Sequence, residues 1–269
     1  MNINMILNFL VKRIAQRKGF FVVLLLASIL QSCSSKKNIL YFQDAQFHRW
    51  EDIKYPKITI QPNDILSIVV STPIAEAAIP YNLVSSSAVA NFDLESLKLR
   101  GYLVSDKGTI DFPVLGKIGL NDLTIEEAEI EVQKQLNQGG HLKNASVKIR
   151  LLNSKVTVLG DVKSPGTFNY SENRISLPQA LGFAGDLNIT GKRKEVLIIR
   201  EENGSRMINQ IDLRTADWFT GPFYYIKPND IIVVKPNRTK VKSAGLIGNA
   251  SVVLTIVSIL LSTAILVTR

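Results

Sequence analysis

Residues 165–185, PGTFNYSENRISLPQALGFAG, contain the signals for one turn, one strand and one capped helix. Pro165-Gly166 marks a turn, and residues 167–170 alternate polar and aromatic side chains, as a half-buried strand does. Ser176 lies three residues before Gln179, the spacing of a capping box, in which each side chain accepts from the other residue's backbone amide. The predicted helix then places four apolar residues on one face and ends at a glycine: Leu177, Ala180, Leu181, Ala184 and Gly185.

The same order of signals occurs earlier in the chain. Residues 107–112 (KGTIDF) correspond to residues 165–170 (PGTFNY), and Thr124 with Glu127 forms a second capping box. The helix predicted here places four apolar residues on one face before Gly139-Gly140: Ile125, Ala128, Val132 and Leu136. The matching order indicates a diverged internal duplication within residues 58–235.

A further pair of motifs supports the duplication. Residues 61–65 (QPNDI) and 227–231 (KPNDI) each open a run rich in β-branched residues. Proline fixes φ and Asn or Asp closes a turn, so we interpret the Pro-Asn-Asp motif as structural and assign it no chemistry.

Short strands account for most of the remaining pattern. Residues 145–152 and 155–160 alternate, and strands at 196–200 and 206–211 are joined across Asn203-Gly204, a hairpin signal. Residues 72–100 are less regular and are expected to form a variable loop region. The fold class predicted is α+β, with two small modules in tandem, each of strands wrapped around one capped helix.

The N-terminal region has the pattern of a secretory signal peptide. An apolar run at residues 20–30 follows four cations, and no acidic residue precedes Asp44. The run is shorter than the roughly 20 residues of a membrane-spanning helix. Leu30-Gln31-Ser32-Cys33 resembles the lipobox of bacterial lipoproteins, which implies cleavage between Ser32 and Cys33 and lipidation of the only cysteine. The alternative is an uncleaved signal anchor with an incidental thiol.

The C-terminal region is predicted to enter a membrane as a helix. Residues 246–267 carry no charge and no proline, and as a helix they would extend about 33 Å, the thickness of a hydrocarbon core. Small polar residues share one helical face: Ser251, Thr255, Ser258 and Ser262. This face either lets helices pack closely in lipid or lines a water-filled lumen in a ring of helices.

Composition argues against several other classes of function. Signal-peptide cleavage lowers the formal net charge from +9 to +5, and the chain has no basic stripe interleaved with aromatics, so nucleic-acid binding is not expected. The remaining positive charge lies largely beside the C-terminal helix, where anionic lipid would attract it. His48 and His141 are isolated, and no phosphate-binding, dinucleotide or hydrolase motif occurs, so neither a metal nor a cofactor is expected.

Ordered motifs along the chain resemble one protein family. The lipobox and residues 38–43 (NILYFQ) look like the start of polysaccharide biosynthesis/export proteins. Residues 58–152, with QPNDILSI, GTIDFPVLGKI and LTIEEAEIEVQKQL, are similar to the export domain of that family. Residues 156–234, with VTVLGDVKSPGTF, SLPQALGFAGD and KPNDIIVV, are similar to its soluble-ligand-binding β-grasp (SLBB) domain.

The resemblance implies a domain order and a function. The expected order is a signal peptide (1–32), a lipid-anchored tether (33–57), an export domain (58–152), a β-grasp domain (153–236), a basic linker (237–245) and a transmembrane helix (246–267). Members are Wza-like outer-membrane lipoproteins that form homo-oligomeric rings for capsular or exopolysaccharide. The implied partner is an inner-membrane polysaccharide co-polymerase with tyrosine-kinase function, and most of the chain would lie in the periplasm.

Two departures from the family pattern leave alternatives open. The chain has room for one β-grasp repeat after the export domain, and its C-terminal helix is more uniformly apolar than an amphipathic pore helix. We therefore expect a passive conduit for polysaccharide, with a lipid-anchored scaffolding or glycan-binding module without its own pore as the alternative. No catalytic motif argues for an enzyme, which would need clustered ionisable groups in a cleft.

Overall fold

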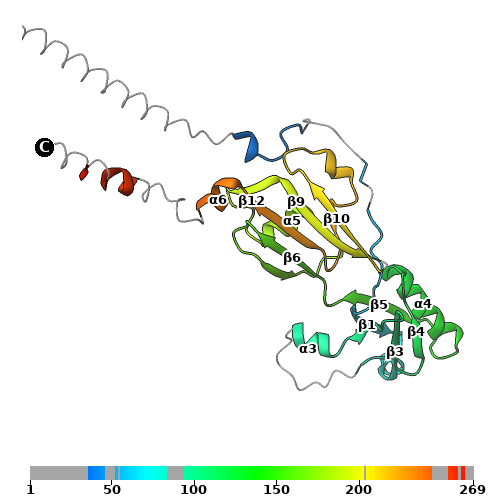
Figure 1. Cartoon of the computed structure of the whole chain (residues 1–269). Coiled ribbons are helices and arrows are strands. Elements are labelled where there is room, and N and C mark those ends of the chain that lie inside the picture. Colours follow the sequence, from blue (N-terminus) through cyan, green and yellow to red (C-terminus); the bar gives the residue numbers. More distant parts are fainter. Residues whose placement is uncertain are drawn as a thin grey trace, which may run out of the picture. The chain divides into compact units, whose positions relative to one another are not determined.

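The computed structural model describes residues 36–45, 52–53, 55–83, 94–202, 204–243, 254–259 and 262–263. Two hydrophobic cores lie within it, one formed by residues between 60 and 149 and the other by residues between 156 and 234. The cores share no residue, so each belongs to a module of its own, and both modules combine helices with strands (Figure 1). The α+β prediction is confirmed.

The first module is built on a three-stranded antiparallel sheet in the order β2-β1-β5. Its central strand is β1 (Ile65–Ser71), flanked by β2 (Tyr102–Leu103) and β5 (Ser146–Leu151). A separate hairpin pairs β3 (Thr109–Phe112) with β4 (Gly116–Gly119). Three short helices, α2 (Ala75–Ala78), η2 (Ile79–Tyr81) and α3 (Leu94–Leu99), lie in the stretch predicted as irregular.

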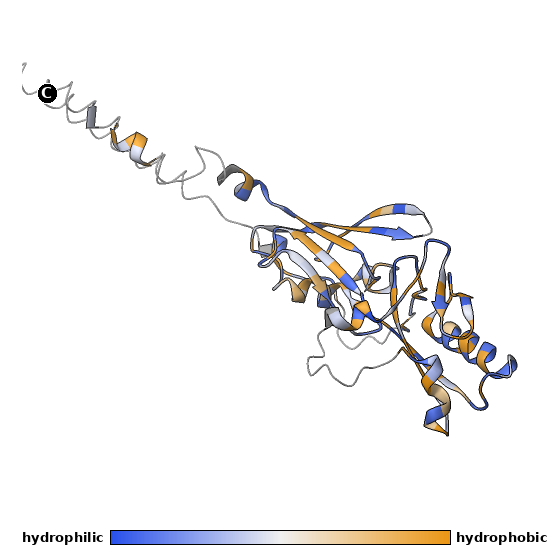
Figure 2. Ribbon diagram, turned by 90° about the horizontal axis from the view of Figure 1, so that it is seen from below, coloured by the Kyte–Doolittle hydropathy of each residue, from blue (hydrophilic) through white to orange (hydrophobic). Residues whose placement is uncertain are grey.

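The one long helix described in this module is α4 (Ile125–Gln138), and its start and buried face are as predicted. The Glu127 amide donates to Thr124 Oγ1 at 3.2 Å, and the Thr124 amide donates to Glu127 Oε2 at 2.9 Å. These bonds satisfy amides that a helix start leaves open, and they hold the pKa of Glu127 below its usual value. Figure 2 shows apolar and polar residues alternating around the helix, and the buried ones are Ala128, Val132 and Leu136.

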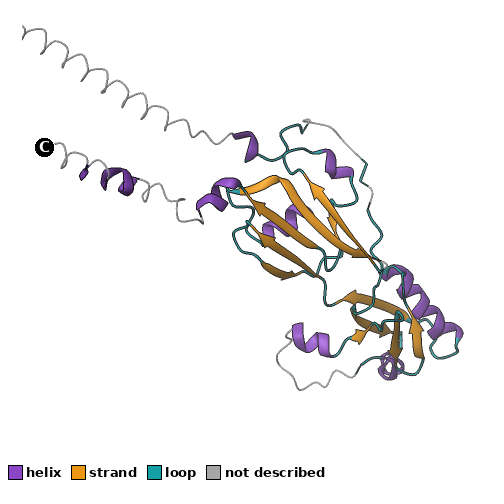
Figure 3. Ribbon diagram, in the orientation of Figure 1, coloured by secondary structure: helices purple, strands orange, loops and turns teal. Residues whose placement is uncertain are grey.

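The second module is built on a five-stranded mixed sheet in the order β10-β9-β12-β6-β7 (Figure 3). Its strands are β6 (Lys155–Gly160), β7 (Gly166–Asn169), β9 (Gly191–Glu202), β10 (Ser205–Ile211) and β12 (Ile231–Pro236). Strands β12 and β6 run parallel, and the other pairs are antiparallel. The predicted hairpin around Asn203-Gly204 is confirmed by the β9–β10 register, although β9 begins five residues earlier than expected. Assignment of this sheet as a β-grasp stays a prediction.

Smaller elements complete the second module. They are β8 (Ile175–Ser176), α5 (Leu177–Phe183), η3 (Asp217–Thr220), β11 (Tyr225–Ile226) and α6 (Arg238–Ser243). Helix α5 begins at the predicted capping box, because the Gln179 amide donates to Ser176 Oγ and the Ser176 amide donates to Gln179 Oε1. Its apolar face, Leu177, Ala180 and Leu181, enters the core as expected.

The two copies of the glycine motif differ in structure. Gly108 adopts a φ of +70° in the turn before β3, whereas Gly166 is the first residue of β7 and has no positive φ. Their strands also pair differently, since β3 pairs with β4 and β7 pairs with β6. The expectation of a glycine turn in both copies is therefore wrong for the second, where Ser164-Pro165 precedes the strand.

The predicted membrane segments lie largely beyond the described part of the chain. Residues 1–32 and Cys33 are outside it, and only 254–259 and 262–263 of the predicted span 246–267 are within it. Among the helices that the structure does describe, none combines the length and apolar composition needed to cross a bilayer. The C-terminal transmembrane helix thus stays a prediction.

Candidate functional site

Three of the residues predicted to share a helical face are described. Ser258 Oγ donates to the Thr255 carbonyl at 2.9 Å, and Ser262 Oγ donates to the Ser258 carbonyl at 2.8 Å. These hydroxyls are therefore satisfied by the helix backbone itself, an arrangement compatible with both lipid and water. Ser251, like the predicted cleavage pair Ser32 and Cys33, lies outside the described residues.

The N-terminal tether docks on the second module through its backbone. The Phe42 amide donates to the Leu213 carbonyl at 3.2 Å, and the Gln43 amide donates to the Arg214 carbonyl at 2.6 Å. The side chain of Asp44 accepts from the Ala216 amide at 2.7 Å. We call residues 41–44 the tether segment. Sequence reasoning used these residues only for the family resemblance, because a four-residue segment has no periodicity to read.

Aromatic packing fixes the tether segment further. The ring of Phe42 lies 6.0 Å from that of Trp218 and 5.1 Å from that of Phe219, between centroids. The backbone φ of Phe42 is +49°, which is uncommon for a bulky residue and costs about 1–3 kcal/mol of conformational strain. Packing in this cluster offsets that strain, since an aromatic pair contributes about 0.5–1.5 kcal/mol beyond the area it buries.

Tyr41 attaches the tether segment to a loop that we call the clamp loop, residues 186–191. Tyr41 Oη donates to Asp186 Oδ1 at 2.6 Å, and the Arg193 guanidinium lies 5.2 Å from the centre of the Tyr41 ring. Burial, and then the hydrogen bond to the Asp186 carboxylate, raises the pKa of Tyr41 above its ordinary value. The phenol therefore stays protonated and keeps donating at neutral pH.

Helix α6 attaches to the same clamp loop. The Asn237 amide donates to the Thr190 carbonyl at 2.8 Å, and Lys240 Nζ is ion-paired with Asp161. Asn188 Nδ2 also donates to Asp161 Oδ1, at 2.9 Å. Desolvation raises the pKa of Asp161, but the hydrogen bonds from Lys240, Thr190 and Asn188 outweigh it and hold that pKa below its usual value. The chain segments that lead to both predicted membrane attachments are thus fastened to one loop.

Arg193 keeps the clamp loop in shape. Its guanidinium is buried, and Nη1 donates to the carbonyls of Asn188 and Gly191 at 3.1 and 3.0 Å. Nη2 donates to the Leu187 carbonyl at 3.4 Å. A planar fork of donors suits three converging carbonyls, which a lysine could not match.

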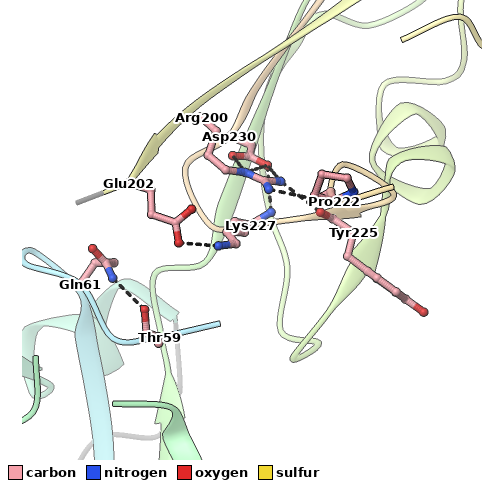
Figure 4. Close-up of polar contacts among 8 residues, drawn as sticks. All are labelled: Thr59, Gln61, Arg200, Glu202, Pro222, Tyr225, Lys227 and Asp230. Atoms are coloured by element: carbon pink, nitrogen blue, oxygen red, sulfur yellow. Dashed lines mark hydrogen bonds and ion pairs between the residues drawn. The ribbon is translucent and has the colours of Figure 1, made fainter. Parts of the chain in front are cut away.

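A second buried cation organises the other end of the module (Figure 4). Arg200 pairs with Asp230 and also donates to the carbonyls of Pro222 and Tyr225, at 3.1 Å each. The Asp230 side chain in turn accepts from the Lys227 amide at 2.9 Å, closing the Pro-Asn-Asp turn. The structural interpretation of that motif agrees with these contacts.

The described part of the two modules contains a cavity but no candidate metal site. No cluster of three or more His, Cys, Asp and Glu residues there could hold a metal ion. A cavity of about 570 Å³ in the first module is lined by β1, η2 and the end of α3. In the lining of this cavity, Asn82 Oδ1 accepts from the Val70 amide at 2.9 Å, and Asn82 Nδ2 donates to the carbonyls of Val70 and Ala78 at 2.9 and 3.0 Å. The Asn82 side chain thus holds the edge of β1.

Comparison with known proteins assigns both modules. Residues 54–152 match the polysaccharide biosynthesis/export protein family, and residues 155–210 match the SLBB domain. The EPS I polysaccharide export outer membrane protein EpsA of Ralstonia solanacearum is 29% identical over 203 residues, 72% of this chain and 52% of that protein. The protein of the same name from Ralstonia nicotianae is 33% identical over 137 residues, 49% of this chain and 35% of its own.

The chain spans about half the length of the first of these curated relatives and about a third of the second. Both relatives are named as outer membrane proteins, and this chain is likewise a protein of the outer membrane. Its export domain precedes its SLBB domain, in the order that the sequence motifs predicted. The chain therefore carries the domain of the polysaccharide biosynthesis/export protein family, followed by an SLBB domain.

Proposed function

We propose that this protein is a subunit of an oligomeric outer-membrane channel through which capsular or exopolysaccharide leaves the cell. The observation that carries the proposal is the succession of an export domain and an SLBB domain in one chain related to outer-membrane export proteins. The family that residues 54–152 match has a transport role.

The proposed mechanism is passive conduction through a closed ring. One uncharged helix cannot form a pore, but identical helices arranged by heterologous contacts around an axis can. Cys33 would carry the lipid anchor, and residues 246–267 would supply one helix per subunit. The driving force would come from the inner-membrane co-polymerase with tyrosine-kinase function, the partner that the family resemblance implies.

Gene deletion tests the transport role directly. A deletion strain should lose surface glycan while intracellular repeat units persist, and the wild-type gene should restore export. A Cys33→Ser gene should restore it poorly, because the protein then lacks its lipid. Unchanged surface glycan in the deletion strain would contradict the proposed function.

Charged substitutions test whether the polar helical face is wet. Ser258→Asp should alter export while leaving the protein in the membrane if this face lines a lumen, since a carboxylate tolerates water but not lipid. Val257→Asp, one residue away on a different face, should instead prevent stable insertion. Because the lipid on Cys33 would retain either variant in the membrane fraction, insertion is measured as protection of residues 246–267 from added protease. If both variants lose that protection, the lumen assignment is wrong.

The uniformly apolar character of residues 246–267 favours a second candidate, a scaffolding or glycan-binding module without a pore. Native mass spectrometry of the detergent-extracted full-length protein separates the two. A lipidated subunit in a closed high-order ring supports the channel, and a lipidated monomer or dimer supports the scaffold.

A further inference from the structure

Two exposed apolar side chains lie on elements that are bonded to each other at one end of the second module. Ile189, in the clamp loop, is 71% exposed, and Val241, in α6, is 61% exposed. The bond from the Asn237 amide to the Thr190 carbonyl joins these elements. Exposed apolar residues are ordinary on protein surfaces, so this pair gains meaning only from the charges and the course of the chain beside it.

Cations lie on the same two elements or beside them. Arg238 and Lys240 lie on α6, and Lys163, whose amide donates to the Asp186 carbonyl at 3.0 Å, borders the clamp loop. Of the neighbouring acids, Asp161 pairs with Lys240, and Asp186 accepts a hydrogen bond from the neutral Tyr41 phenol. The positive charge that this end of the module offers to lipid therefore comes from Lys163 and Arg238. Exposed aliphatic groups with a basic rim are the composition of a surface that lies in the headgroup region of an anionic membrane.

The course of the chain points to the same partner. Helix α6 ends at Ser243, three residues before the apolar stretch 246–267, and Tyr41 follows the predicted lipidation site, Cys33, by eight residues. Eight extended residues reach at most about 27 Å. Both predicted membrane attachments therefore leave the module from segments that are bonded to the clamp loop.

We propose that the clamp loop and α6 form a membrane-contact face of the SLBB module. Ile189 and Val241 enter the headgroup region, and Lys163 and Arg238 lie beside lipid phosphates. The tether segment, through the bond from Tyr41 to Asp186, holds the start of the eight-residue connection to Cys33 at the clamp loop. This inference rests on the outer-membrane channel proposed above and adds the surface by which its body meets the bilayer.

Site-directed fluorescence tests the face in the full-length lipidated protein, whose native thiol is expected to be blocked. Ile189→Cys and Val241→Cys are labelled with an environment-sensitive dye and reconstituted into vesicles of phosphatidylethanolamine and phosphatidylglycerol. The matched control is Ile208→Cys, because Ile208 lies on β10 of the same module and is 62% exposed. Spin-labelled lipid should quench the dyes at 189 and 241 at least twofold more than the dye at 208.

Each other outcome overturns the inference. Equal quenching at all three positions means that this end of the module does not touch lipid. A blue-shifted dye at 189 or 241 without lipid quenching means that a neighbouring subunit covers the face. If quenching persists unchanged in vesicles of phosphatidylcholine alone, the role of the cations is wrong. The proposed function is tested separately, by whether these variants restore surface glycan in the deletion strain. Failure of the membrane-contact face and failure of the export function are therefore distinguishable.

Discussion

Arg200 and Asp230 form a buried bidentate ion pair, with Nε 3.0 Å from Oδ1 and Nη2 2.7 Å from Oδ2. Their side chains are 7% and 1% exposed. Asp64 occupies the same position in the duplicated turn, and its Oδ2 likewise accepts a backbone amide, from Gln61 at 2.9 Å. It is also buried, but it pairs with no cation in the described part of the chain. One repeated turn thus holds two buried carboxylates, of which Asp230 is paired with a cation and Asp64 is not.

Breaking the buried pair should destabilise the second module strongly. Asp230→Asn leaves the Arg200 guanidinium buried without a counter-charge, which costs about 3–5 kcal/mol. Urea unfolding of the full-length protein in detergent, followed by Trp218 fluorescence in a Trp50→Phe background, measures the free energy of unfolding. The double variant Arg200→Met/Asp230→Leu should recover much of the loss, since it removes both charges. A loss below about 1 kcal/mol for Asp230→Asn would contradict the prediction.

The stability of the first module should fall as pH rises through the weakly acidic range. Burial raises the pKa of Asp64 from 3.8 to about 6, so the folded state binds more protons than the unfolded state between these values. Stability therefore decreases from about pH 4 to about pH 6, by on the order of 2–3 kcal/mol, and the loss persists at pH 7. Hydrogen exchange of the β1 and β5 amides at several pH values reports this slope.

Asp64→Asn should abolish that pH dependence, because the amide oxygen can still accept from Gln61 but the side chain cannot ionise. At pH 7 the variant should be at least as stable as the wild type. Asp230→Asn serves as the contrasting variant of the same turn, since it should destabilise at pH 7. An unchanged slope in Asp64→Asn would show that another group titrates.

Substitution by alanine should change the stability of the second module in opposite directions at Gly160 and at Gly182. Gly160 has a φ of +93°, and an added Cβ would lie 2.0 Å from the Val234 carbonyl oxygen on the paired strand β12. Gly160→Ala should therefore cost roughly 3 kcal/mol or more. Gly182 lies in α5 with nothing within 4 Å of its Cβ position, so Gly182→Ala should stabilise by about 0.5–1 kcal/mol. Thermal unfolding of the two variants gives the comparison, and equal midpoints would refute it.

Removing the Phe42 ring should release the tether segment. Phe42→Ala deletes the contacts with Trp218 and Phe219, so the emission of Trp218, again in a Trp50→Phe background, should shift to longer wavelength. Cleavage by a protease within residues 41–44 should become several-fold faster. Phe183→Ala is the control, because Phe183 is an exposed aromatic of the same module that packs on Phe168. If Trp218 emission is unchanged in Phe42→Ala, the tether segment does not dock as described.

The sequence by itself determined the local structure of both modules and their family. Capping boxes at Thr124 and Ser176 act within four residues, and the apolar face of α4 repeats at helical spacing, so each can be read along the chain. The Pro-Asn-Asp turns close on their own aspartates for the same reason. The order of these motifs, rather than any one of them, indicated an export domain followed by an SLBB domain.

Only the tertiary structure decided how distant segments meet. Tyr41 and Asp186 lie 145 residues apart, and Lys240 and Asp161 lie 79 apart, so no periodicity links them. The different settings of Asp64 and Asp230 also depend on a distant residue, because Arg200 comes from β9, 30 positions before Asp230. Local patterns encode backbone conformation through neighbouring residues, whereas burial and charge pairing depend on which strands the completed sheet places side by side.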